Sequence, residues 1–418
     1  MGFVSAAGRF SQQHLARDAL VKILLVHNTY QQPGGEDVVF EQECRLLQQM
    51  GHSVVTYCRS NHEIEELSTI GRTTLVMRTV WASDTHRDFG AFLVRENPDI
   101  VHVHNTFIMV SPSIYSVCRK RGVPVVQTLH NFRLLCPGAQ FLRDGKVCED
   151  CVDHSLWRSV WHACYRDSRP ATASVALMLA WHRRSGTWDD LIDRYIALTD
   201  FARNKFIASG FPADKIVVKP NFVDPDPGTK QGPGEGALYV GRLSKEKGLP
   251  TLIDAWRRLP KECSLQIVGD GPQRAELEQE VQRSGLSSIQ FRGRVSHSET
   301  LAAIKSSRFL VLPSQWYEGF PMTIAESFAC GTPVICSKLG AMEEIVADSH
   351  TGLHFVPGDS EDLARKLAWA FAHPSEIAAM GRAARAEYEA HYTPQSAYRQ
   401  LMDIYEQTLA AYAYVQPA

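Results

Sequence analysis

The sequence predicts an α/β protein made of two consecutive Rossmann-like domains, each a parallel sheet with helices on both faces. Two observations support this fold class. Short apolar runs of strand length alternate with amphipathic stretches of helix length, which is the pattern of a covered parallel sheet. The alternation stops in a stretch rich in proline, glycine and aspartate, at 224–236, and then begins again. We therefore expect two similar domains that face each other across a cleft.

The composition is that of a globular protein. At 418 residues the chain is long enough for two or three domains. Its formal net charge is −2 and it has no run rich in lysine or arginine, so we expect no nucleic-acid partner. No apolar run reaches the ~20 residues that span a bilayer, and the N-terminal lead lacks the apolar core of a signal peptide. We expect a cytoplasmic protein, with the inner face of the cytoplasmic membrane as an alternative location.

The first domain is expected at 21–222, after a loosely ordered lead at 1–20. Apolar runs predict its strands at 21–26, 53–57, 99–104, 123–128, 195–198 and 216–218. After the first strand, we expect a helix that Asp37 caps and Gly51 ends. Gly34 and Gly35 lie in the loop between this strand and this helix.

The second domain is expected at 223–393 and repeats the pattern. Its strands are predicted at 237–242, 265–268, 289–292, 309–312 and 334–335, of which the third has the weakest pattern. A helix is predicted at 249–258. The last segment, 394–418, contains an amphipathic helix that we expect to pack back on the first domain. Its expected buried contacts are Tyr398, Leu401, Met402, Ile404 and Tyr405.

The most informative stretch is Glu318-Gly319-Phe320-Pro321, which follows the strand at 309–312 and leads to Glu326. One carboxylate therefore lies on a loop, and the other in the first turns of a helix predicted at 323–330. Free N–H groups at a helix start form an anion site, and glycine lets the backbone approach a ligand. A carboxylate beside an anion site suggests a nucleotide sugar. The alternative is that Thr323 and Glu326 form a capping box, which needs no ligand.

Two cations, Arg242 and Lys247, follow the first strand of the second domain. The planar guanidinium can bind phosphate oxygens, and the ammonium adds a point charge. The alternative is a solvated basic loop. We favour phosphate binding because the loop directly follows a strand and the two glutamates lie in the same domain. The glycines of 269–272 are interpreted as a tight backbone turn.

Together these motifs resemble glycosyltransferase family 4, whose members are retaining, nucleotide-sugar-dependent enzymes of the GT-B fold. The resemblance covers about residues 22–405, and its specific part is the two-glutamate motif with the upstream arginine and lysine. It implies that the domain at 223–393 binds the donor. The domain at 21–222, joined by the returning helix at 394–418, would then bind the acceptor.

The resemblance also implies roles for individual residues. Arg242 and Lys247 would bind the donor diphosphate, and Glu326 would hold the ribose hydroxyls. Glu318 would face the transferred sugar. The remaining donor contacts would come mainly from backbone groups, at Gly34, Gly35, Val295, Gly319 and Phe320.

On the acceptor side, His130 is similar to the family's cleft histidine beside the reacting sugar. We expect the catalytic group to consist of His130, Glu318, Arg242 and Lys247. His104 and Asn105 are weaker candidates for the acceptor side.

The implied function is transfer of a sugar, with retention, from a UDP- or GDP-sugar to a glycan or lipid-linked acceptor, as in polysaccharide biosynthesis. The cations and helix N–H groups would stabilise the departing diphosphate, so we expect catalysis without a metal cofactor. Asp224-Pro225-Asp226 could hold a metal but is interpreted as turn chemistry, because it lies in the linker. Alternatives are a GT-B sugar-nucleotide epimerase or hydrolase, and a non-catalytic nucleotide-sugar-binding protein.

A polar and aromatic insertion at 131–170 departs from the family plan. It contains Cys136, Cys148, Cys151 and Cys164, of which two form a Cys-x-x-Cys pair. Four thiolates can close a tetrahedral zinc site that stiffens a loop with little core. The alternative is four free thiols, since cytoplasmic cysteines are usually reduced.

The apolar stretch at 171–181 ends in His182-Arg183-Arg184. It is interpreted as a buried helix because apolar residues surround it. The alternative is a helix on a membrane surface, which would suit a lipid-linked acceptor.

Overall fold

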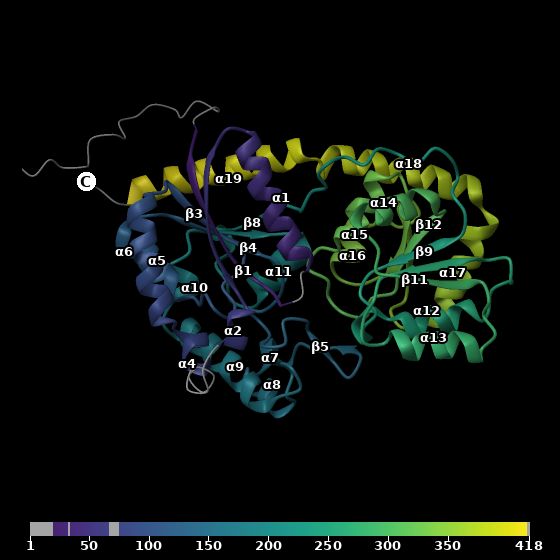
Figure 1. The fold of residues 1–418 in the computed structure, drawn as a ribbon, viewed down its shortest axis with the longest axis horizontal. Coiled ribbons are helices and arrows are strands. Elements are labelled where there is room, and N and C mark those ends of the chain that lie inside the picture. Colours follow the sequence, from purple (N-terminus) through teal and green to yellow (C-terminus); the bar gives the residue numbers. More distant parts are fainter. Residues whose placement is uncertain (1–19, 32–33, 67–74, 416–418) are drawn as a thin grey trace, which may run out of the picture.

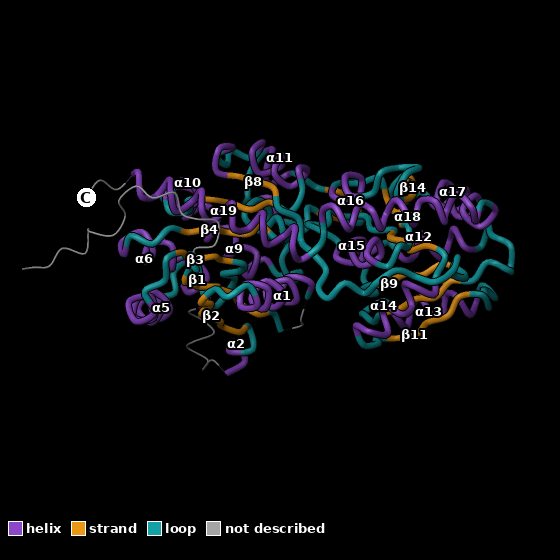
Figure 2. Tube along the Cα trace, turned by 90° about the horizontal axis from the view of Figure 1, so that it is seen from above, coloured by secondary structure: helices purple, strands orange, loops and turns teal. Residues whose placement is uncertain are grey.

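The computed structural model describes residues 20–31, 34–66 and 75–415 and shows two α/β domains joined along one side by the C-terminal helices (Figure 1). Apart from Leu20, the lead at 1–20 lies outside the described residues. Seen from above, the strands of both domains lie between helices (Figure 2). The predicted α/β fold class is therefore confirmed.

The N-terminal sheet has six parallel strands in the order β2-β1-β3-β4-β7-β8. Their bounds are β1 Lys22–Thr29, β2 Ser53–Ser60, β3 Ile100–Val103, β4 Val125–Leu129, β7 Arg194–Ala197 and β8 Ile216–Val218. All six predicted strands are present. Because β3 and β4 are parallel neighbours, His104 and His130 leave the sheet at the same edge.

The C-terminal sheet also has six parallel strands, in the order β11-β10-β9-β12-β13-β14. Their bounds are β9 Ala237–Val240, β10 Leu265–Val268, β11 Ile289–Gly293, β12 Phe309–Leu312, β13 Val334–Ser337 and β14 Gly352–Phe355. The weakly patterned strand β11 is confirmed, and β14 is an addition that the sequence analysis did not predict. Since β9 pairs with β12, the arginine–lysine loop and the Glu318 loop leave adjacent strand ends.

Helices cover both sheets. The N-terminal domain contains α1 Gly35–Gln49, α2 Glu63–Glu66, α4 Leu75–Val80, α5 Ser83–Glu96, α6 Ser113–Arg121, α9 Arg169–Arg184, α10 Thr187–Asp190, α11 Asp200–Ala208 and the 3-10 turn η1 Ala213–Lys215. The insertion adds β5 Leu142–Arg143, β6 Lys146–Val147, α7 Asp150–Asp153 and α8 Trp157–Trp161. The C-terminal domain contains the 3-10 turn η2 Lys245–Lys247 and the helices α12 Leu249–Trp256, α13 Arg274–Arg283, α14 His297–Ser306, α15 Met322–Ala329, α16 Ala341–Ile345, α17 Ser360–Ala372 and α18 Pro374–His391.

The start of α1 differs from the prediction. Its N-cap is Gly34, and Asp37 is the third residue of the helix rather than its cap. The Asp37 carboxylate accepts a hydrogen bond from the Gly34 N–H at 2.7 Å and lies 2.8 Å from His27 Nε2. Asp37 therefore still closes the first turn of the helix, from inside it.

The last helix, α19 Pro394–Val415, returns to the N-terminal domain (Figure 1). Four of its predicted contacts are buried in one cluster with residues of β1, β3 and β4, namely Leu401, Met402, Ile404 and Tyr405. Tyr398 is half-buried beside them. The preceding helix α18 packs on α15 within the C-terminal domain. The two consecutive helices thus tie both domains together.

The linker is also tied to this side of the molecule. Asp226 accepts a hydrogen bond from the Gly228 N–H at 2.8 Å, as expected for turn chemistry. It also receives two hydrogen bonds from the Arg385 guanidinium on α18, at 2.8 and 2.7 Å. Its carboxylate is thereby engaged in a turn and an ion pair.

The stretch at 171–181 lies within α9, which buries one face, including Val175, Met178 and Leu179, against the N-terminal core. The opposite face exposes Leu177 and Trp181. The sequence analysis expected a helix buried on all sides, and this expectation is wrong because one face of α9 is exposed. Among the described residues, no helix is both long and apolar enough to cross a bilayer. Contact of α9 with a membrane surface stays a prediction.

The packing of α19 yields a stability test. Leu401 is fully buried, so Leu401→Ala would leave a cavity and lower the free energy of unfolding by about 2–5 kcal/mol. Chemical denaturation of the purified chain measures this loss. Gln407→Ala, at an exposed position of the same helix, should change stability little. Equal stability of Leu401→Ala and the parent chain would contradict this account of α19.

Candidate functional site

Glu318 is the centre of a compact hydrogen-bonded group at the end of β12. Its Oε1 lies 2.7 Å from Lys247 Nζ and accepts hydrogen bonds from Ser314 Oγ at 2.8 Å and Trp316 Nε1 at 2.9 Å. The residue is 8% exposed, and the Lys247 ammonium lies 5.3 Å from the Trp316 ring centre. A carboxylate held by three donors has a fixed orientation. The structure therefore brings together two predicted site residues, and it adds Ser314 and Trp316, which carry no motif of their own.

The helix after this group, α15, begins without a side-chain cap. Its N-cap is Pro321, so Thr323 and Glu326 do not form the capping box that was the alternative reading. The first N–H groups of the helix thus have no side-chain cap and are available to an anion. Glu326 is half-buried, and burial raises the pKa of its carboxyl above the usual value. His297 Nδ1 lies 3.7 Å from Glu326 Oε1.

The loop that carries Arg242 packs tightly on its neighbour. A Cβ at Gly269 would lie 1.9 Å from the Gly241 carbonyl oxygen, and one at Gly271 would lie 2.4 Å from the Leu243 carbonyl oxygen. These glycines therefore serve backbone packing, as the sequence analysis interpreted them. Arg242 itself is exposed, and its guanidinium has no ion pair or hydrogen bond with the described residues. Unlike Lys247, it is not drawn to Glu318.

The two domains meet where Gly319 faces His130. A Cβ at Gly319 would lie 2.3 Å from the His130 carbonyl oxygen, so no other residue fits there without backbone movement. A Cβ at Gly35 would lie 3.9 Å from Met322 Cγ, at the start of α15. The histidine, the glycine pair and the two-glutamate motif are thus neighbours, although they come from different domains.

Two other donor-side predictions are placed less directly. Phe320 is buried in the core of the C-terminal domain, where its ring lies 5.7 Å from that of Tyr392. Val295 is half-buried and packs on the same core. Their side chains are therefore structural, and only their backbone groups are candidates for donor contact.

Glu36 is a site residue that the sequence analysis missed. It follows the glycine pair, and its Oε2 accepts hydrogen bonds from Tyr30 Oη at 3.1 Å and Asn131 Nδ2 at 3.2 Å. Burial raises the pKa of its carboxyl to about 8. Tyr30, Glu36, His130 and Arg133 line a small cavity of about 40 Å³ within the N-terminal domain. The position of Glu36 directly after Gly34-Gly35 was the signal in the sequence that could have identified it as a site residue.

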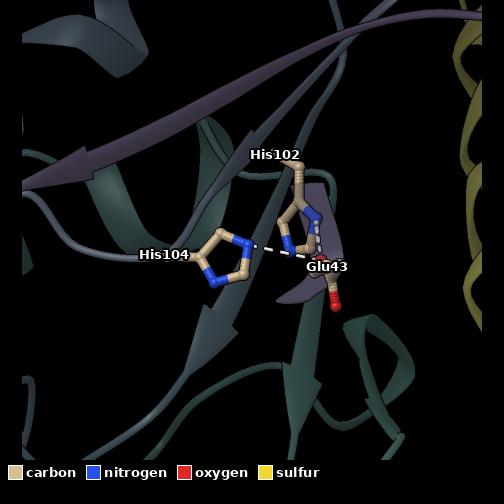
Figure 3. A group of neighbouring side chains, drawn as sticks. All are labelled: Glu43, His102 and His104. Atoms are coloured by element: carbon tan, nitrogen blue, oxygen red, sulfur yellow. Dashed lines mark ion pairs between the residues drawn. The ribbon is translucent and has the colours of Figure 1, made fainter. Parts of the chain in front are cut away.

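A second missed group lies behind His130. His130 Nε2 is 2.9 Å from His104 Nδ1, and His104 Nε2 is 3.2 Å from Glu43 Oε1. The same oxygen lies 3.0 Å from His102 Nδ1 (Figure 3). Among the described residues, Glu43, His102 and His104 form the one group of three metal-type ligands whose atoms all lie within 4.8 Å.

His104 and Asn105 are buried and line the same cavity as His130, so their role on the acceptor side stays a prediction. His104 is 3% exposed and lies behind His130. Asn105 donates to the Asn28 carbonyl oxygen at 2.8 Å and accepts from the Phe107 N–H at 2.9 Å. Asn105 therefore shapes the loop after β3.

The four insertion cysteines gather in the N-terminal domain. A Cβ at Gly138 would lie 3.7 Å from Cys136 Sγ and 3.6 Å from Cys164 Cβ. A hydrogen bond from Cys151 lowers the pKa of the Cys136 thiol to about 6. All ten cysteines are free of disulfide bonds, but no three of these four sulfurs lie within 4.8 Å of one another. A zinc ion bound by all four cysteines would therefore have to draw their sulfurs closer together.

Two family models match the chain, one per domain. Residues 34–221 match the "Glycosyl transferase 4-like domain", and residues 224–387 match "Glycosyl transferases group 1". The chain is 30% identical over 292 residues to a glycogen synthase of Mycobacterium tuberculosis, covering 69% of this chain and 64% of that protein. It is 32% identical over 247 residues to a phosphatidyl-myo-inositol mannosyltransferase of Mycobacterium leprae, covering 55% and 63%. The first relatives are thus matched over about half to two thirds of their length.

Solved structures share the fold at low sequence identity. Anabaena HepE in complex with UDP superimposes with a TM-score of 0.64 at 20% identity, covering 92% of this chain and 100% of that one. Sucrose-phosphate synthase from Thermosynechococcus elongatus gives a TM-score of 0.70 at 20% identity, covering 94% and 100%. With both domains matched by family models and both sheets by known structures, the chain belongs to glycosyltransferase family 4 and has the GT-B fold.

Proposed function

We propose that the protein is a retaining glycosyltransferase that moves a sugar from a nucleotide-diphosphate donor to a glycan or lipid-linked acceptor. The observation that carries this proposal is the junction of the two domains. There Lys247 of the C-terminal domain is paired with Glu318, which directly precedes Gly319 in the sequence. The backbone of Gly319 in turn lies against the His130 carbonyl oxygen of the other domain. A cation at this junction can stabilise the departing diphosphate, and an oriented carboxylate and a histidine can face the sugar.

The donor is bound mainly by the C-terminal domain in this proposal. Arg242 is exposed and unengaged within the described structure, so its guanidinium is available for phosphate oxygens. Lys247 and the uncapped start of α15 add positive charge at the same strand ends. Glu326 then holds the ribose hydroxyls with its two carboxylate oxygens. The UDP bound to HepE supports a UDP-sugar donor, and GDP-sugar is the alternative.

In the proposed reaction, the bond between the sugar's anomeric carbon and the diphosphate oxygen breaks through an oxocarbenium-like state. The diphosphate leaves with the bonding electron pair, and Arg242, Lys247 and the α15 N–H groups stabilise its charge. The acceptor hydroxyl attacks the anomeric carbon from the same face and passes its proton to the departing diphosphate oxygen, so the anomeric configuration is kept. Glu318 is held by three donors and is therefore oriented to face the transferred sugar.

The proposed leaving-group stabilisation uses protein cations, so no divalent metal is required. Asp226, in the literal Asp-x-Asp sequence, is occupied by Arg385 and Gly228 and lies on the α18 side of the linker. This placement supports turn chemistry rather than metal–diphosphate binding.

Two other functions would use the same donor site. An epimerase or hydrolase of the same fold would release or convert the sugar without an acceptor. A binding protein would bind the donor without turnover. The ordered group around Glu318 and His130 favours transfer, because a protein that only binds needs no carboxylate fixed at the domain junction.

We also propose that Cys136, Cys148, Cys151 and Cys164 bind a structural zinc ion. Support comes from the burial of Cys136 and Cys151 and from the position of Gly138, which lies beside both Cys136 and Cys164. Zinc would replace the thiol protons and hold the insertion beside β4.

Loss of the free guanidinium should weaken donor binding. Arg242→Ala is expected to reduce affinity for the nucleotide sugar roughly 10- to 100-fold, because a charged hydrogen bond contributes about 1.5–3 kcal/mol. Isothermal titration with UDP- and GDP-sugars measures this change. Lys245→Ala, in the same loop and also exposed, is the matched control and should bind normally. Equal weakening by both variants would show a general charge effect instead.

The stereochemistry of the product tests the reaction. We expect the new glycosidic bond to have the anomeric configuration of the donor, measured by NMR of the product formed with each acceptor of a panel. Activity should survive EDTA treatment. An inverted anomeric centre would contradict the proposed mechanism, and a strict requirement for Mg²⁺ or Mn²⁺ would contradict the proposed role of the protein cations.

Elemental analysis tests the zinc site. Protein purified without chelator should contain about one zinc ion per chain, and Cys148→Ser should lose it. Cys263→Ser, which changes a buried cysteine of the other domain, should retain the metal. Zinc-free protein with normal thermal stability would show that the four cysteines are free thiols.

A further inference from the structure

We propose that Glu43 and His104 are positioning residues that fix the ring and tautomer of His130, so that His130 offers an unprotonated Nδ1 to a hydroxyl of the substrate. The inference rests on the proposed function, because it concerns the same junction. It goes beyond that function by assigning a role to two buried side chains that do not touch the donor site.

The geometry is a chain of three side chains leading from the core to the junction. Glu43, on α1, is 1% exposed, and its Oε1 lies 3.2 Å from His104 Nε2. His104 is 3% exposed, and its Nδ1 lies 2.9 Å from His130 Nε2. The rings of the two histidines are stacked, with centres 5.1 Å apart. Figure 3 shows His104 and His102 both directed toward Glu43.

The charge states are set by the surroundings. Burial alone would raise the pKa of the Glu43 carboxyl, but Lys219, His102 and His104 hold it well below its usual value, so Glu43 is a carboxylate. Burial, together with neighbouring His102, lowers the pKa of His104 to about 4. Burial and His104 also lower the pKa of His130 well below its usual value. Both rings are therefore neutral near pH 7, with one proton each.

The positions of these protons follow from hydrogen-bonding chemistry. His104 Nε2 and Glu43 Oε1 lie 3.2 Å apart, and both are buried atoms that form no hydrogen bond elsewhere. A carboxylate can only accept, so a proton on His104 Nε2 is the one that this contact can accommodate. His104 Nδ1 is then an acceptor and takes the proton of His130 Nε2–H. His130 Nδ1 is left with a lone pair. This atom has no hydrogen-bond partner among the described residues, and it is not one of their buried unpartnered atoms, so it is accessible to a ligand.

The rest of the cluster supports a relay rather than a cation site. Lys219 Nζ lies 3.1 Å from Glu43 Oε2, so a divalent ion at Glu43 would face an ammonium group. The two ring nitrogens of His102 lie 2.7 Å from Tyr405 Oη and 2.8 Å from Thr128 Oγ1. Lys219 balances the carboxylate. His102 Nδ1 also lies 3.0 Å from Glu43 Oε1, but the ring that continues to His130 is that of His104, whose Nδ1 lies 2.9 Å from His130 Nε2.

The test uses Glu43→Gln in the full chain. Lys219 can only donate, so the glutamine oxygen should turn toward it and the amide N–H₂ should face His104. That arrangement makes His104 Nε2 an acceptor and moves its proton to Nδ1. His130 must then accept at Nε2 and carry its own proton on Nδ1. The variant therefore predicts inversion of the His130 tautomer.

The readout is ¹⁵N NMR of histidine-labelled protein, with the His130 signals assigned by their loss in His130→Gln. Wild type should show protonated Nε2 and bare Nδ1, and Glu43→Gln should show the reverse. For sugar transfer, Glu43→Gln should lower kcat/KM about 10- to 100-fold, the range expected for partners that orient a functional histidine. Nucleotide affinity should be unchanged, since the side chains proposed to bind the nucleotide, Arg242, Lys247 and Glu326, lie in the other domain. Glu41→Gln, exposed on the same helix, is the control.

A protonated Nδ1 on His130 in the wild type would overturn the proposal without any variant. So would an unchanged tautomer and unchanged kcat/KM in folded Glu43→Gln. If the loss of the negative charge beside buried Lys219 prevents folding of this variant, the wild-type tautomer still decides. Because the NMR readout needs no turnover, a wild type with the expected tautomer but no transfer to any acceptor would refute the proposed function and leave the relay standing.

Discussion

The close approach of Gly319 to the His130 carbonyl oxygen is the constraint on which the rest of the site depends. A side chain at Gly319 would place its Cβ 2.3 Å from that oxygen and would push the domains apart. The contact joins the loop after β12 to the residue after β4. Since parallel strands end at the same edge of each sheet, this one contact also brings together the glycine pair of α1 and the start of α15.

The two domains place their charged groups differently at this junction. On the C-terminal side, charge is exposed or paired at the surface of a loop, where Lys247 contacts Glu318 and Arg242 is unengaged within the described residues. On the N-terminal side, the charges of Glu43 and Lys219 are buried and compensate each other, and the histidines in front of them are neutral. An anionic donor is therefore attracted to one domain, while the other offers uncharged hydrogen-bonding groups to hydroxyls.

The C-terminal helices support this arrangement from the opposite side. α18 packs on α15, whose first turn faces the junction, and α19 packs on the sheet that carries His104 and His130. Tyr405 on α19 also contacts His102 directly, at 2.7 Å. The same helix that covers the N-terminal core thus reaches the buried cluster behind the site, so fold stability and site geometry share residues.

The sequence by itself determined the alternation of strands and helices, the break at 224–236 and the functional loops that follow Gly241 and Leu312. These features are local: apolar runs, glycines and adjacent charges carry them within a few residues. Only the tertiary structure decided that Thr323 and Glu326 form no capping box, that Glu36 has a raised pKa, and that Glu43 reaches His130 through His104. The physical reason is that burial and charge compensation are made by residues far apart in the chain, whose proximity depends on the order of strands in the sheet.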